Sequence, residues 1–148
     1  MFKVQNVTIA TEEMSLKNNH LSKRDFKLHP KIIRNTGIID ESQNKYFTLL
    51  SVTLENTTDT PLPVNLHVSL RAIFTIEKEL GCEQKHIDRF LRLQGVSILY
   101  PYVRSSLTSL TAAASLPPIF LPVVNTLTIF KEDLEWIKEN FGTNNLAS

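Results

Sequence analysis

The side chains of this sequence that could bind a metal ion or act as a nucleophile are few and scattered. Cys82 and His86 are separated by three residues, a spacing that zinc ligands can have. A zinc site needs further ligands, and no matching pair lies near them in the sequence. The other histidines, at positions 20, 29 and 67, fall in different segments. We therefore expect no metal site and a free thiol at Cys82; the alternative is a nucleophilic Cys82 paired with a distant histidine.

Motifs that cradle phosphate or activate a serine are missing from the sequence, which contains no G-x-S-x-G, G-x-x-x-x-G-K-[ST] or G-x-G-x-x-G. Its 16 Lys and Arg against 15 Asp and Glu give a formal net charge of +1, too little to attract nucleic acid or an anionic membrane. A basic segment, residues 17–34, has Phe26 as its one phenylalanine, so we interpret it as a solvated loop. The sequence predicts neither an enzyme, a cofactor nor a nucleic-acid partner.

The stretch SLPPIFLPVVN, residues 115–125, is apolar and carries three prolines and no charge. Prolines lack the backbone N–H and fix φ, so this connector is expected to stay extended without joining a sheet. Its large apolar side chains are too many for one extended segment to hide beneath itself. We expect some of them to line a groove for apolar partners and the others to fill the core under the last helix.

Four strands are predicted to position this connector. Alternation of apolar and polar residues favours strands at 46–54 and 64–76, joined as a hairpin with one packed and one wet face. Two further strands are expected at 2–16, with a bulge between Val4 and Val7, and at 31–39. The polar residues 17–29 between them read as a long crossing loop.

Helices are predicted for the second half of the chain. A short helix over 83–94 is expected to stop at Gly95 in a left-handed conformation. The next should begin near Ser97, because Pro101 is tolerated only in the first turn, and run to about Ser115. The last, residues 126–141, carries an apolar stripe with Asp133 among its outward acidic residues.

The long segment between Arg104 and Lys131 contains no charged residue. A helix that is polar only through Ser and Thr can be covered on both sides, because those hydroxyls bond back to the preceding turn. Either the helix lies between the sheet and a partner subunit, or it is buried inside a monomer. We expect a single α+β domain over residues 1–148, cytoplasmic and without membrane insertion, because the chain lacks an apolar signal core, a run of 18 apolar residues and a second cysteine.

The order of these segments resembles the SecB export-chaperone family, most specifically in GVSILYPYVRSSLTSL followed by SLPPIFLPVVN. In that family a helix opened by tyrosine or phenylalanine, proline and tyrosine, with an arginine two residues on, precedes a proline-bearing apolar connector that ends in asparagine. The matching positions are Tyr100, Pro101, Tyr102, Arg104, Pro117 and Asn125.

The resemblance implies a four-stranded antiparallel sheet with a long crossover loop, packed by two main helices. It implies a cytoplasmic homotetramer, a dimer of dimers whose long helices lie between the sheets. The expected interface residues are Tyr102, Ser106, Ser109, Leu110 and Ala113.

The resemblance also implies an ATP-independent chaperone, or holdase, that binds unfolded polypeptides or preproteins in apolar grooves without nucleotide or metal. Carried over by position, the groove would draw on Phe26, Leu28, Phe74, Ile76, Leu116, Ile119, Phe120, Leu121, Val123, Leu127 and Phe130. The alternative is a chaperone or adaptor for one partner, such as the antitoxin of a toxin–antitoxin pair. Relatives that dock the SecA motor are usually acidic on the outer sheet face and tail, whereas this chain has His67 and Arg71 on that face, which argues against SecA.

Overall fold

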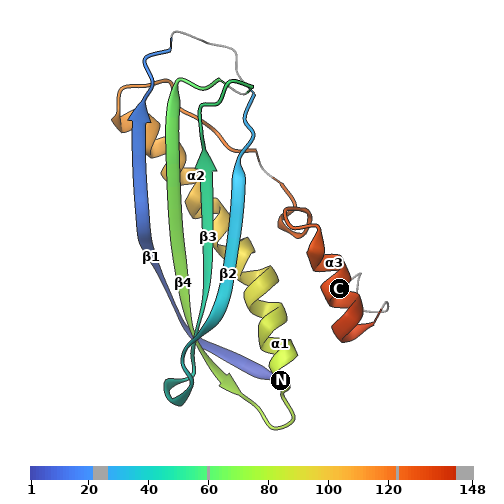
Figure 1. Ribbon diagram of the computed structural model, residues 1–148. Helices are drawn as coiled ribbons and strands as arrows, with labels where there is room; N and C mark the ends of the chain where they lie inside the picture. Colours follow the sequence, from blue (N-terminus) through green and yellow to red (C-terminus); the bar gives the residue numbers. More distant parts are fainter. Residues whose placement is uncertain (22–26, 60, 123, 143–148) are drawn as a thin grey trace.

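The computed structural model describes residues 1–21, 27–59, 61–122 and 124–142. Its four strands form one antiparallel sheet in the order β1-β4-β3-β2, and helix α2 lies along one face of that sheet (Figure 1). The strands are β1 (Phe2–Asn18), β2 (Lys31–Asp40), β3 (Lys45–Leu54) and β4 (Val64–Lys78). The helices are α1 (Gln84–Arg89), the π-helical η2 (Phe90–Gln94), α2 (Gly95–Ala113) and α3 (Glu132–Phe141), with 3-10 turns η1 (Glu41–Gln43) and η3 (Thr126–Thr128). The predicted α+β class and antiparallel sheet are confirmed.

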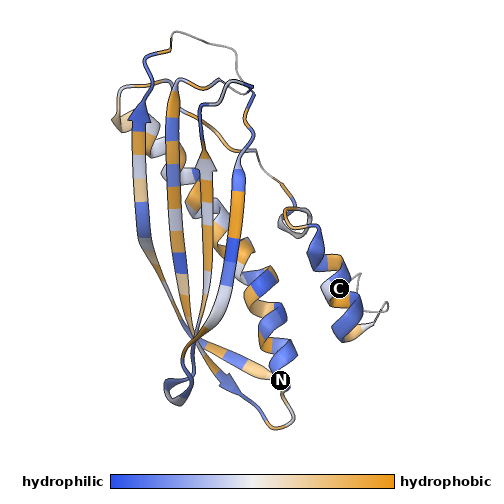
Figure 2. Ribbon diagram, in the orientation of Figure 1, coloured by the Kyte–Doolittle hydropathy of each residue, from blue (hydrophilic) through white to orange (hydrophobic). Residues whose placement is uncertain are grey.

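The core lies between the sheet and α2, and period two decides which strand residues enter it. Along β4, every second residue from Val64 to Ile76 is at most 3% exposed, as the alternation predicts. Figure 2 shows the same alternation of polar and apolar residues along β4. The predicted bulge in β1 is also present, as a shift of register between Val4 and Asn6.

The predicted break between two helices at Gly95 is wrong. Gly95 has φ −58° and ψ −43°, and its N–H bonds to the Phe90 carbonyl five residues back, so the chain stays helical from α1 through η2 into α2. The glycine is needed because α2 crosses β3 closely: a Cβ on Gly95 would overlap the Thr48 side chain, lying 2.7 Å from its Cβ. Close approach to the sheet, and not a left-handed turn, therefore explains this residue.

The expected start of the long helix near Ser97 is wrong for the same reason. Pro101 lies inside α2 rather than in its first turn. Its missing N–H leaves the Ser97 carbonyl without the usual donor, which costs the helix about 3 kcal/mol. Burial of Val96 and Leu99 against the sheet offsets that cost.

The last helix is shorter than predicted. Residues 126–128 form the turn η3, and α3 begins only at Glu132 and ends at Phe141, just before Gly142, whose φ is 80°. The helix lies beside the β2 edge of the sheet, apart from α2 (Figure 1). Its position therefore depends on a small set of contacts with β2, α1 and η2.

Candidate functional site

The connector, residues 115–125, runs back along α2 and is bonded to it by α2 side chains. Pro117, Pro118 and Pro122 have no N–H, so at these residues the connector offers only carbonyl acceptors, and side chains of α2 donate most of the bonds that hold it. Tyr100 Oη donates to the Pro122 carbonyl at 2.7 Å, Arg104 Nε to Leu121 at 3.0 Å, and Thr108 Oγ1 to Ile119 at 2.9 Å, while Thr111 Oγ1 accepts from the Ile119 N–H at 3.0 Å. Burial raises the pKa of Tyr100, so its hydroxyl keeps its proton, and this bond, to a higher pH than a solvated tyrosine would.

These bonds give part of the charge-free face of α2 a role within the chain. Thr111 is fully buried and Thr108 is half-buried, and the hydroxyls of both are bonded to the connector. The other side of α2 stays open. Of the residues expected at an interface, Tyr102 is 54% exposed, Ser109 and Ala113 are exposed, and Ser106 and Leu110 are half-buried.

The residues expected to line a groove differ in how far they are buried. Phe74 and Ile76 are fully buried in the core, so a client could reach them only if neighbouring side chains moved. Ile119, Leu121 and Phe130 are also buried, and Leu28 and Leu116 are half-buried against the core. Phe120 is 66% exposed, which makes it the expected groove residue most open to solvent among those described. Phe26, Val123 and the side chain of Leu127 lie outside the described part of the chain.

Two hollows flank α2 where the connector meets it. One of about 250 Å³ is bounded by Pro101, Ser105 and Ser109 on α2 and by Phe120 on the connector. The other, of about 630 Å³, is bounded by Phe2, Phe90, Leu93, Ser97, Asn125 and Thr126. The connector thus borders space that apolar side chains of another molecule could enter.

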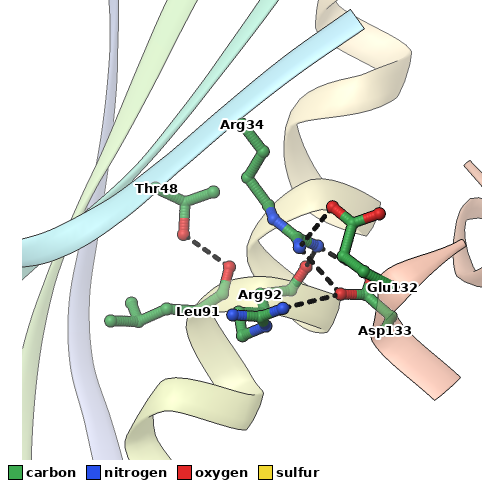
Figure 3. A network of polar contacts seen from close by, with 6 residues as sticks. All are labelled: Arg34, Thr48, Leu91, Arg92, Glu132 and Asp133. Atoms are coloured by element: carbon green, nitrogen blue, oxygen red, sulfur yellow. Dashed lines mark hydrogen bonds and ion pairs between the residues drawn. The ribbon is translucent and has the colours of Figure 1, made fainter. Parts of the chain in front are cut away.

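Helix α3 is fixed at its N-terminal end by a buried carboxylate, although the helical pattern predicted that this residue faces solvent (Figure 3). Asp133 is 2% exposed and receives two bonds from Arg34 of β2, from Nη1 at 2.8 Å and from Nη2 at 2.7 Å. Arg92 of η2 adds a third, from Nη2 at 3.3 Å. A bidentate arginine–carboxylate pair of this kind fixes both distance and orientation.

Aromatic side chains of the same segment cover the two guanidinium groups. The Arg34 guanidinium carbon lies 4.2 Å from the ring centre of Phe130, and that of Arg92 lies 4.6 Å from the ring of Trp136. Both contacts are cation–π geometries, which suit the flat and weakly hydrated guanidinium. The sequence around Asp133 did not predict these contacts, because the arginines that make them are far away along the chain.

The other end of α3 is held by α1. Lys85 Nζ donates to the carbonyl of Asn140 at 3.0 Å, where a cation also favours the negative end of the helix dipole. The ring of Phe141 lies 5.4 Å from that of His86 and 5.0 Å from the Arg89 guanidinium. Contacts at both ends therefore determine where α3 lies.

The π-helical segment η2 supplies the backbone acceptors of this site. Its wide turns free carbonyls from their usual partners four residues on, and side chains of the sheet take them up. Thr48 Oγ1 donates to the Leu91 carbonyl at 2.7 Å, and Arg34 Nη1 donates to the Arg92 carbonyl at 2.9 Å (Figure 3). Strands β2 and β3 thus hold η2, and through it Arg92, against the sheet.

On the outer face of the sheet, acidic side chains of β1 lie beside basic side chains of β4. A second register shift in β1, between Thr11 and Glu13, brings consecutive glutamates to one face. Glu12 lies 3.2 Å from Nε of Arg71, and Glu13 lies 3.5 Å from Nε2 of His67. Each acid on this stretch of β1 therefore faces a basic side chain of β4.

The described residues contain neither a cluster of metal ligands nor a membrane-spanning helix. Within them, no three His, Cys, Asp or Glu side chains gather where they could hold a metal ion. Nor is any described helix long and apolar enough to cross a membrane. Cys82 is a half-buried free thiol whose Sγ lies 3.7 Å from the Glu83 carbonyl.

Comparison with known proteins gives this arrangement a family. The sequence model of the family described as "Preprotein translocase subunit SecB" matches residues 3–136. The chain belongs to the SecB family. An uncharacterized protein of Methanocaldococcus jannaschii is 28% identical over 124 residues, 82% of this chain and 77% of that protein. The protein-export protein SecB of Anaplasma phagocytophilum is 26% identical over 89 residues, 60% of this chain and 56% of that protein.

A solved structure shows the same fold as this SecB-family chain. It is a SecB-like chaperone of Mycobacterium tuberculosis in complex with a peptide from the HigA1 antitoxin, with a TM-score of 0.69 and 16% identity over 83% of this chain and 90% of that one. The chain spans little more than half the length of the Anaplasma SecB it matches. The family and fold implied by the resemblance are confirmed, and family membership supports the chaperone function.

Proposed function

We propose that this protein is a cytoplasmic, ATP-independent holdase of the SecB type, which binds unfolded polypeptides or preproteins along the connector. The observation that carries the proposal is the connector itself: its backbone is bonded to α2 while Phe120 stays 66% exposed beside a hollow. Covering such a side chain with an apolar client side chain releases free energy without any cofactor or catalytic step. Strand β2, an edge of the sheet, adds backbone groups that an extended chain can pair with whatever its sequence.

The test is suppression of aggregation. In molar excess, the purified protein is expected to keep a chemically denatured client from scattering light, and to bind several unrelated unfolded clients that compete with one another. A Phe120→Ser variant should bind them about 10-fold more weakly, because burying a phenylalanine contributes roughly 1.5–3 kcal/mol. Leu80→Ser is the matched control, since Leu80 is fully exposed in the turn after β4. Failure to bind any unfolded client would remove the proposal.

The alternative is a chaperone dedicated to one partner, such as an antitoxin. The observation that favours it is the structural relative from Mycobacterium tuberculosis, solved with an antitoxin peptide. Under this alternative, one client binds and unrelated unfolded chains do not compete for the site. Arg71 and His67 beside the β1 glutamates argue against SecA as a further partner, because relatives that dock SecA are usually acidic on that face.

We further propose a homotetramer, a dimer of dimers, in which the open side of α2 meets other subunits. Tyr102, Ser109 and Ala113 lie on that side and are exposed in the single chain. Ser109→Glu should therefore weaken assembly, because contact between subunits would bury an unpaired carboxylate. Light scattering across a dilution series should show a lower mass for Ser109→Glu and an unchanged mass for the uncharged control Ser109→Ala. Equal masses for both variants would place the interface elsewhere.

A further inference from the structure

We propose that Arg34 and Arg92 form a carboxylate-binding site that Asp133 fills while α3 lies against β2, and that an acidic residue of a bound client replaces Asp133. The inference rests on the proposed holdase function and adds a client chemistry to it. Asp133 then acts as an internal stand-in for the client. The site favours clients in which an acidic residue is flanked by aromatic ones.

Positive charge exceeds buried negative charge at this site. Two guanidinium groups share one buried carboxylate, that of Asp133. Glu132 does not restore neutrality at close range, because its side chain is 63% exposed and its Oε1 lies 3.9 Å from Arg34 Nη2. Arg92 Nε is buried and has no acceptor among the described residues. The arginines therefore form a site with spare donors for a carboxylate.

The two arginines are held in place by the sheet and η2, independently of α3. The Arg34 side chain is 6% exposed, and its Nη1 also donates to the Arg92 carbonyl at 2.9 Å. That carbonyl belongs to η2, which Thr48 ties to β3 through the Leu91 carbonyl. If α3 moves away, these bonds remain and the guanidinium of Arg34 stays oriented. When α3 moves away, Arg34 loses both its bidentate carboxylate and the Phe130 ring, and a client carboxylate beside an aromatic residue restores both contacts.

Helix α3 and the residues before it contact the arginines through one carboxylate and two aromatic rings, which a client can also supply. The contacting residues are three positions apart in the sequence. The Phe130 ring lies over Arg34, the Asp133 carboxylate accepts from both arginines, and the Trp136 ring lies over Arg92. In contrast, Leu134 of the same helix is 52% exposed. An acidic residue between aromatic residues of an unfolded chain offers the same three groups.

The test compares two labelled peptides that are identical except for one central residue between two aromatic residues, Asp in one and Asn in the other. Their affinities are measured by fluorescence anisotropy with the full-length wild-type, Asp133→Asn and Arg92→Gln proteins. The wild type should bind the Asp peptide several-fold more tightly than the Asn peptide. Asp133→Asn should widen that preference to about 10-fold, since a hydrogen bond to a charged group contributes on that scale. Arg92→Gln should narrow the preference, because Arg34 alone then binds the carboxylate.

Controls separate local recognition from general attraction. Glu132→Gln removes an exposed acid of the same turn and should leave the preference unchanged. A third peptide, with its acidic residue moved to one end, should bind like the Asn peptide. Arg92 is 23% exposed, so its replacement tests the site even where Asp133→Asn loosens α3.

The results separate failure of the carboxylate site from failure of the holdase function. Equal affinities for the Asp and Asn peptides, in both the wild type and Arg92→Gln, overturn the carboxylate site while the holding of unfolded clients stands. If no peptide binds and denatured clients also aggregate freely, the holdase function fails and the carboxylate site fails with it.

Discussion

An Arg34→Met variant is expected to exchange the amide hydrogens of α3 about 100-fold faster than the wild type, while β3 and β4 keep their protection. Removing Arg34 leaves the Asp133 carboxylate, 2% exposed, with a single bond of 3.3 Å from Arg92. Leaving one partner of a buried ion pair in place costs roughly 3–5 kcal/mol. The chain avoids that cost by letting α3 move into water, so the loss appears as local opening rather than unfolding of the sheet.

Hydrogen exchange followed by mass spectrometry checks this result segment by segment. Lys31→Met is the matched control, because it removes a cation from an exposed position of the same strand. The double variant Arg34→Met/Asp133→Leu should regain much of the protection, since an apolar pair of similar volume often replaces a buried ion pair at little cost. Unchanged exchange of α3 in Arg34→Met would show that the ion pair does not hold the helix.

The same reasoning explains why an ion pair fixes α3 at all. A buried pair contributes little net stability once desolvation is counted, whereas a larger apolar contact would hold the helix firmly. Among the described apolar side chains of this segment, Ile137 and Phe130 are buried, whereas Ile129, Trp136 and Phe141 are half-buried. An attachment of this kind sets a defined position that a competing ligand can still replace.

The sequence predicted those parts of the fold that depend on local patterns. Alternation along β4 predicted which side chains enter the core, because every residue of a strand faces one side of the sheet or the other. The run from Tyr100 to Asn125 indicated the family, since its prolines and aromatics follow each other closely in the chain. The connector was also expected to be extended, because proline restricts φ locally.

Contacts between distant segments could not be predicted in this way. Asp133 has the pattern of a solvated helix acid, and its burial depends on Arg34, which is 99 residues away in the sequence. The roles of Thr108 and Thr111 depend likewise on where the connector returns along α2. Residue type alone did not distinguish a hydroxyl facing a partner subunit from one bonded to the chain's own backbone.

Gly95 shows the same limit at a single residue, because its role depends on a strand that is distant in the sequence. Gly95→Ala should lower the free energy of unfolding by about 2–3 kcal/mol. In an exposed helix interior the same change would stabilise by nearly 1 kcal/mol, because glycine is the poorer helix former. The sign reverses because the new methyl group would overlap Thr48, lying 2.7 Å from its Cβ, and would push α2 away from β3. That shift would also stretch the bond between Thr48 and the Leu91 carbonyl.

Chemical denaturation at one fixed protein concentration measures this loss, because the stability of an assembling protein depends on its concentration. Ser105→Ala is the control for helix propensity, since Ser105 is exposed on the same helix and should gain a few tenths of a kcal/mol. Thr48→Ala combined with Gly95→Ala should recover part of the loss by removing the overlap, and only part, because the Leu91 carbonyl then lacks its donor. A Gly95→Ala protein as stable as the wild type would mean that α2 does not cross β3 this closely. The carboxylate site would then lose one of the two contacts that hold η2 against the sheet, the bond from Thr48.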